Sequence, residues 1–151
     1  MKVIGLGAPQ EVRVRFDACE VEVLVAVLRE QRAHATRDAA QTYATTPPGQ
    51  TRAIDDRHDR LRAVEGSLVQ LEEQPPDNKP GAVLVADTEF VSEVVRDGAR
   101  EALRQLDEAY ERYEDHATPE ARDALLSAAT TTQAWVATLT AVDGVDQGWG
   151  A

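Results

Sequence analysis

Residues 119–140 read PEARDALLSAATTTQAWVATLT, and this stretch decides the fold class. Small or apolar side chains recur in it at intervals that alternate between four and three residues: Ala121, Leu125, Ala128, Thr132, Trp135 and Leu139. This is the period of a helix with one buried face, whereas a strand would alternate at every second residue. Thr118 is a good N-cap and Pro119 suits the first helical position, so we expect a helix over 119–140.

Two segments upstream carry the same helical period. The stripe in residues 88–115 runs from Val91 to Tyr113, and Asp87 precedes it as an N-cap. The stripe in residues 51–74 is narrower and has charges on both sides, which is typical of a helix packed in a bundle. We expect a helix over each range. Proline-rich stretches at 47–49 and 75–81 separate the segments, because proline removes a backbone donor and clashes with the preceding helical turn.

The first long segment, residues 18–44, leaves two alternatives open. Apolar and charged side chains alternate from Glu20 to Val27 as they would in a strand, and valine favours strands. However, Asp17 is a suitable N-cap, and helical spacing continues from Leu24 to Ala35. We expect one helix over 18–44, with a strand over its first half as the alternative.

Short apolar runs predict a small β element. Residues 2–6 and 11–16 read as two strands of a hairpin, and 83–85 as a third strand. The runs that end at Asp17 and Asp87 each precede a long helix, a proline break and a second helix. A duplicated strand–helix–helix unit explains this similarity between the two halves of the sequence, and so does chance.

The predicted architecture is a single, mainly α domain over residues 1–140, followed by a flexible tail at 141–151. Its fold is an up-and-down four-helix bundle with a small β hairpin near the N-terminus.

The charge of the chain excludes several classes of partner. The formal net charge is −11, and Lys2 and Lys79 are the only lysines. Such a surface repels nucleic acids and anionic membranes. Depletion of lysine is typical of proteins adapted to concentrated salt, and codon bias of a GC-rich genome is an equal alternative. No apolar run approaches the ~20 residues that cross a bilayer, and no signal peptide is evident, so we expect a cytoplasmic protein. We expect the lone Cys19 to be buried.

Arg52 and His58 are the weak catalytic candidates, with five residues between them. Their spacing resembles that of the HEPN family of helical RNA-cleaving domains, and this resemblance implies a helical-bundle nuclease. The alternative that we favour is a structural His58, inside the bundle at the edge of its stripe and hydrogen-bonded to Asp55. The acidic charge also disfavours an RNA-cutting surface.

No other pattern points to catalysis, a metal or a cofactor. Glu-x-x-His is absent, as is any arrangement of serine, cysteine or glycine typical of nucleophiles or phosphate loops. The first helix carries apolar residues on more than one side, and Trp149 lies in the tail. We therefore expect a non-enzymatic interaction or assembly module that forms a homodimer. The interaction candidates are Val23, Val25, Val27 and Trp149. The alternatives are a nuclease or hydrolase that uses Arg52 and His58, and a regulator that binds a small apolar ligand between helices.

Overall fold

The computed structural model describes residues 2–6, 11–73 and 81–146. These residues contain four long helices and three short strands. In chain order these are β1 (Lys2–Leu6), β2 (Glu11–Asp17), α1 (Ala18–Thr45), α2 (Arg52–Glu73), β3 (Gly81–Asp87), α3 (Thr88–Asp115) and α4 (Pro119–Asp146). The predicted mainly α fold with four helices and a hairpin near the N-terminus is confirmed. The expected third strand is present and extends beyond 83–85 at both ends.

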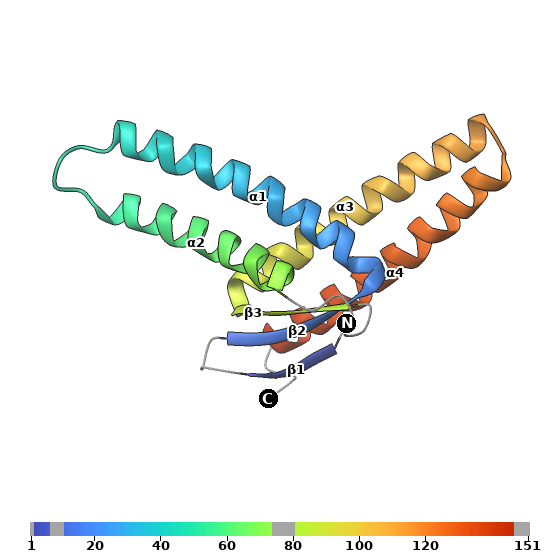
Figure 1. Cartoon of the computed structure of the whole chain (residues 1–151), viewed down its shortest axis with the longest axis horizontal. Coiled ribbons are helices and arrows are strands. Elements are labelled where there is room, and N and C mark those ends of the chain that lie inside the picture. The colour runs from blue at the N-terminus through green and yellow to red at the C-terminus, as the bar shows by residue number, and fades with distance from the viewer. Residues whose placement is uncertain (1, 7–10, 74–80, 147–151) are drawn as a thin grey trace.

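The four helices of the predicted up-and-down bundle are arranged as two pairs. Figure 1 shows two antiparallel helix pairs, α1–α2 and α3–α4, that diverge from the sheet as the arms of a V. The physical reason lies in the strands. β2 and β3 pair antiparallel and each leads directly into a long helix, so α1 and α3 leave the sheet from opposite ends and cross where the arms meet. We call α1–α2 the first arm and α3–α4 the second arm.

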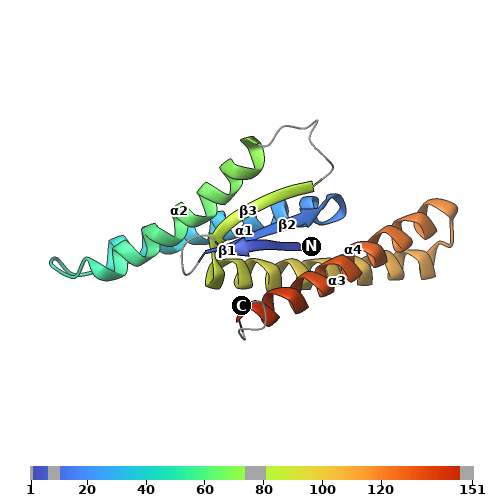
Figure 2. The same ribbon diagram turned by 90° about the horizontal axis from the view of Figure 1, so that it is seen from below.

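The sheet is antiparallel, with strand order β1-β2-β3. Val14 pairs with Leu84 at the middle of the β2–β3 ladder, and the register of β1 shifts between Val3 and Gly5. One face of the sheet carries Val12, Val14, Phe16 and Leu84, all at most 1% exposed. Figure 2, seen from below, looks onto the strands with α1 and α3 behind them. The buried face of the sheet therefore closes the core at the point where the two arms cross.

The strand–helix–helix unit occurs twice, as β2-α1-α2 and as β3-α3-α4. In both units an aspartate, Asp17 or Asp87, is the N-cap of a helix of 28 residues. Figure 1 shows the helix pairs of the two units extending in opposite directions, to the left and to the right of the picture, from the same side of the sheet. The repeat that was weak in the sequence is thus evident in the architecture.

The first half of α1 is helical, so the strand alternative for residues 20–27 was wrong. Asp17 and Glu20 form a capping box that fixes the start of the helix. The Glu20 carboxylate accepts a hydrogen bond from the Asp17 backbone N–H at 3.0 Å and one from the Thr138 hydroxyl at 2.5 Å. Glu20 is 0% exposed, and these bonds compensate for burying it. They also join the start of α1 to α4.

Trp135 is the largest fully buried side chain of the core. Its ring centroid lies 5.5 Å from that of Phe16. A Cβ atom placed on Gly98 would lie only 2.3 Å from the indole ring, which is far inside van der Waals contact. The absence of a side chain at Gly98 therefore lets α3 approach the indole.

The predicted boundary between the last helix and the tail needs correction. α4 continues six residues past the expected end at Thr140 and stops at Asp146, so residues 141–146 are helix and not tail. Val142 explains the extension, because it continues the stripe of Trp135 and Leu139 and is 1% exposed. The remainder of the predicted tail, including Trp149, lies outside the described residues.

The outer edge of β3 is covered by a side chain. The Gln70 amide of α2 accepts from the Val85 N–H at 3.0 Å and donates to the Val85 carbonyl at 3.1 Å. This amide copies the pair of hydrogen bonds that a neighbouring strand would make. On the other side of the ladder, β1 occupies the outer edge of β2.

Candidate functional site

Four large apolar side chains of the second arm are exposed to solvent. Leu103 is 47%, Tyr110 53%, Leu126 56% and Val136 49% exposed. Each follows directly after a residue of the predicted or observed core stripe: Ala102, Ala109, Leu125 and Trp135. They are therefore rotated by one residue away from the interface between α3 and α4.

These four side chains share one side of the arm. In an antiparallel helix pair, the positions that follow the core positions of both helices lie on the same side. The register is fixed by the contact of Gly98 with Trp135 and by a hydrogen bond of 3.2 Å from the Thr132 hydroxyl to the Ala102 carbonyl. Half-buried Ala129 follows Ala128 in the same way. We call this surface the second-arm flank, and it consists of Leu103, Tyr110, Leu126, Ala129 and Val136.

The corresponding surface of the first arm has a different character. The residues that follow buried Ala35, Ala39, Val64 and Leu68 are Thr36, Ala40, Glu65 and Val69, and all four are exposed. Val69 is the one large apolar side chain among these four residues. The fold therefore does not require apolar residues on this side of an arm, and those of the second-arm flank call for another explanation.

The valines predicted as interaction residues lie elsewhere. Val23 and Val27 are 3% and 4% exposed and belong to the core, and Val25 is half-buried. The apolar surplus of α1 is covered by the chain itself, because the sheet and α3 pack against this part of the helix. Val23 and Val27 are thus corrected to core residues, whereas the predicted homodimer stays a prediction.

Arg52 and His58 both lie exposed on α2. His58 was expected inside a bundle, and that expectation was wrong because the outer part of the first arm extends away from the rest of the molecule (Figure 1). Within the described residues, no group of three or more His, Cys, Asp or Glu side chains is arranged to hold a metal ion. Because both side chains are exposed, Arg52 and His58 are not enclosed in a site by the described residues.

Cys19 is half-buried rather than buried. Burial, and then the charges of Glu20 and Asp17, raise the pKa of its thiol. A raised pKa keeps the sulfur protonated at neutral pH, which makes Cys19 a poor nucleophile.

A cleft of about 440 Å³ lies between the arms. Its walls are strongly charged and come from three helices. They consist of Val27, Glu30, Gln31, His34 and Arg37 of α1, Arg60 of α2, and Asp97, Arg100, Glu101 and Arg104 of α3.

Two polar contacts join the arms beside this cleft. The Gln31 amide nitrogen donates to the Asp97 carboxylate at 2.7 Å, and Arg60 lies 2.8 Å from Glu93. Because the carboxylate can only accept, the Gln31 oxygen must point away from it. That oxygen is buried and has no hydrogen-bond partner among the described residues.

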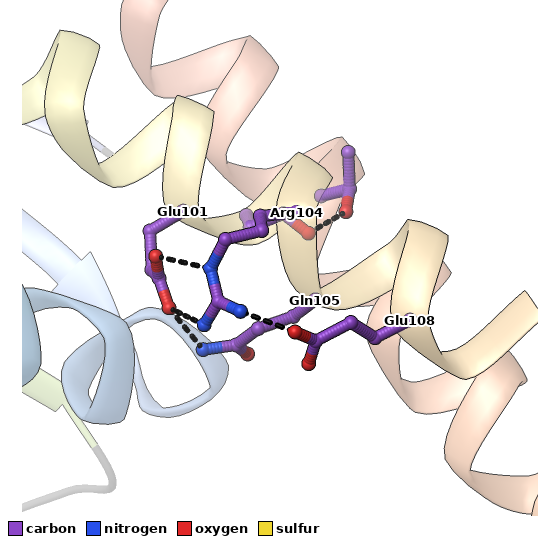
Figure 3. A network of polar contacts seen from close by, with 6 residues as sticks. Glu101, Arg104, Gln105 and Glu108 are labelled. Carbon is purple, nitrogen blue, oxygen red and sulfur yellow. Dashed lines mark hydrogen bonds and ion pairs between the residues drawn. The ribbon is translucent and has the colours of Figure 1, made fainter. Parts of the chain in front are cut away.

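One wall of the cleft is a network of polar contacts on α3, shown in Figure 3. Arg104 donates to both Glu101 and Glu108, with 2.9 Å from its Nε to Glu101, and Gln105 donates to Glu101 at 3.2 Å. The hydrogen bond from Arg104 lowers the pKa of the Glu101 carboxyl. The hydrogen bond to Glu101, with the charges of Glu101 and Glu108, raises the pKa of Arg104. Glu101 and Arg104 are therefore both charged at neutral pH.

Comparisons of the chain with protein-family models, with curated proteins and with solved structures gave no match. In the part of the chain that is described, none of the helices is both long enough and apolar enough to span a bilayer.

Proposed function

We propose that the protein is a non-enzymatic, intracellular assembly module whose partner is a second copy of the same chain. The second-arm flank carries this proposal, since its four large apolar side chains are each about half exposed. Large apolar side chains exposed on one side of a helix pair are typical of protein–protein contacts.

The second-arm flank limits the electrostatic cost of pairing two acidic chains. In a two-fold symmetric dimer each surface meets its own copy. On a chain of net charge −11, most surfaces would then bring carboxylates against carboxylates. Four of the five flank side chains are uncharged and the fifth, Tyr110, carries a phenol, so a contact made through these side chains does not itself bury a carboxylate. A hydrogen bond with Glu114 raises the pKa of that phenol, which keeps it neutral.

The shape of the second arm supports the same pairing. Figure 1 shows the arm extending past the sheet, so its outer half is open to an approaching molecule. Two antiparallel helix pairs that meet flank to flank form a four-helix bundle shared between the subunits. The dimer thus completes the bundle that a V-shaped single chain leaves open.

Sedimentation equilibrium at micromolar concentration in high salt tests the dimer. We expect Leu103→Glu to give a folded monomer, because it places a carboxylate on the dimer contact. Val69→Glu is the matched control, since Val69 on the first arm is also 47% exposed, and we expect this variant to dimerise. A wild-type chain that sediments only as a 16.5 kDa species would exclude the proposal, as would equal dissociation of both variants.

We further propose that the acidic, lysine-poor surface is an adaptation to concentrated salt. The 27 acidic and 16 basic side chains repel one another in dilute buffer, and salt screens this repulsion. We expect the melting temperature to rise between low and molar KCl. A melting temperature that stays constant or falls would leave codon bias as the explanation for the composition.

A further inference from the structure

The cleft between the arms is richer in arginine than the chain as a whole. Carboxylates outnumber basic side chains by 11 in the whole sequence, whereas four arginines and three carboxylates line this cleft. Two further carboxylates, Glu93 and Glu108, pair with Arg60 and Arg104. On an acidic molecule, a concave site rich in arginine attracts anions more than the rest of the surface does.

Two residues of the cleft lining, Arg104 and Glu101, already pair with each other in the polar network on α3. Arg104 is held between Glu101 and Glu108, so its guanidinium is committed to protein partners. Glu101 is likewise committed to Arg104 and Gln105. This pair forms a fixed wall and leaves three arginines to consider.

The remaining arginines are held more loosely. Arg100 is 79% exposed and lies 3.6 Å from Asp97, whose carboxylate already accepts the Gln31 amide. Arg60 has one ion pair, to Glu93, with its side chain 40% exposed. Arg37 is exposed. Such arginines can turn toward a ligand at small cost, because exposed ion pairs contribute little to stability.

These three arginines come from three helices and from both arms. Arg37 belongs to α1, Arg60 to α2 and Arg100 to α3. A carboxylate presents its acceptor oxygens in one plane, whereas a phosphate presents oxygens in several directions and carries more charge. Guanidinium groups that converge from different helices therefore match phosphate better. A volume of about 440 Å³ also falls in the range of small-molecule pockets, which is roughly 300–1,000 Å³.

We propose that the cleft between the arms binds a small organic phosphate, with Arg37, Arg60 and Arg100 as its ligands for the phosphate group. Glu30 and His34 line the cleft on the same helix as Arg37 and provide hydrogen-bonding groups for the organic part. The site is separate from the second-arm flank, which shares no residue with it. A bound ligand contacts both arms and so restricts the angle between them.

Calorimetric titration of the full chain tests this site, with AMP and inorganic phosphate as probes and adenosine as the uncharged counterpart. We expect AMP to bind, phosphate to bind more weakly, and adenosine to give no heat of binding. We expect Arg37→Ala and Arg60→Ala each to weaken AMP binding by about tenfold or more. Raising the KCl concentration should weaken binding as well.

Arg122→Ala is the matched control, because Arg122 is an exposed arginine of α4 that does not line the cleft. This variant should bind AMP as the wild type does, and circular dichroism checks that all three variants are folded. The site is refuted if neither AMP nor phosphate binds at millimolar concentration. It is also refuted if adenosine binds as well as AMP, or if Arg122→Ala loses as much affinity as Arg37→Ala.

Discussion

The two arms share one backbone plan and differ in what they expose and what they bury. Both begin at an aspartate N-cap at the end of a sheet strand, continue for 28 helical residues and return as a second helix. The second arm buries a tryptophan and exposes four large apolar side chains on one side, whereas the equivalent residues of the first arm include one large apolar side chain, Val69. The repeated fold thus needs only its inner stripe to be apolar. The outer surfaces are free to differ, and that freedom allows a function on one arm alone.

The largest expected effect concerns Trp135, the core residue of the second arm. It is the seventeenth residue of α4, and the first arm has the smaller Leu68 at the same position of α2. We expect Trp135→Ala to lower the free energy of unfolding by about 3–5 kcal/mol, because it leaves a cavity against Phe16 and Gly98. Urea denaturation followed by circular dichroism measures this. Val69→Ala is the exposed control, because Val69 is 47% exposed and lies outside the second-arm flank, and it should cost no more than about 0.5 kcal/mol. Equal losses for the two variants would contradict the assigned core.

The next prediction concerns the buried polar link between the two arms, from Thr138 of α4 to Glu20 of α1. Thr138→Val removes the hydroxyl that donates to the Glu20 carboxylate and leaves a buried carboxylate oxygen short of a donor. We expect a loss of about 1–3 kcal/mol in the free energy of unfolding. Thr140→Val is the matched control, since its exposed hydroxyl donates only to the Val136 carbonyl of its own helix. If both valine variants were as stable as the wild type, the link would not contribute to the fold.

The smallest predicted effect depends on pH. Glu101 and Arg104 of α3 occupy the same helix positions as Gln31 and His34 of α1, so the first arm has no equivalent ion pair there. The pKa of Glu101 is lowered in the folded state. Its ion pair therefore stabilises the protein above the unfolded pKa, and this contribution is lost as the pH falls through the folded value.

We accordingly expect Glu101→Gln to melt slightly below the wild type at neutral pH, with the difference vanishing in acid below the ordinary pKa of a glutamate. Paired thermal melts across this pH range measure the effect. Glu111→Gln, which changes an exposed glutamate of the same helix, serves as the control. A difference between Glu101→Gln and wild type that persists unchanged in acid would show that the ion pair is not its source.

Local signals in the sequence were enough to place the helices. Asp87 and the Thr118-Pro119 pair mark helix starts that the structure confirms. The missed end of α4 has a local cause as well. Gly144 disfavours a helix, but Val142 packs into the core and stabilises the helix beyond Thr140. The Asp17–Glu20 capping box was also readable from its spacing, although only Asp17 was recognised.

The candidate sites depend on how segments meet in space, and this limits what the sequence can predict. Val23 and Val27 appeared to be surplus apolar residues because the sequence does not show that the sheet and α3 cover them. Only part of the second-arm flank could have been found from the predicted stripes. Val136 directly follows Trp135 of one stripe, whereas Leu103 and Tyr110 were themselves assigned to the stripe of residues 91–113 and are about half exposed. The cleft could not have been found, because Arg37, Arg60 and Arg100 come together only through the crossing of α1 and α3.

The amide of Gln70 has a consequence for the fate of partly unfolded molecules. While α2 is in place, its side chain occupies the Val85 backbone groups, and no foreign strand can add to that edge of the sheet. If α2 detaches, a free strand edge appears, and the core cluster that contains Trp135 loses Val64 and Leu68. Ordered aggregation would then begin from this partly unfolded molecule, and detachment of α2 would control its rate.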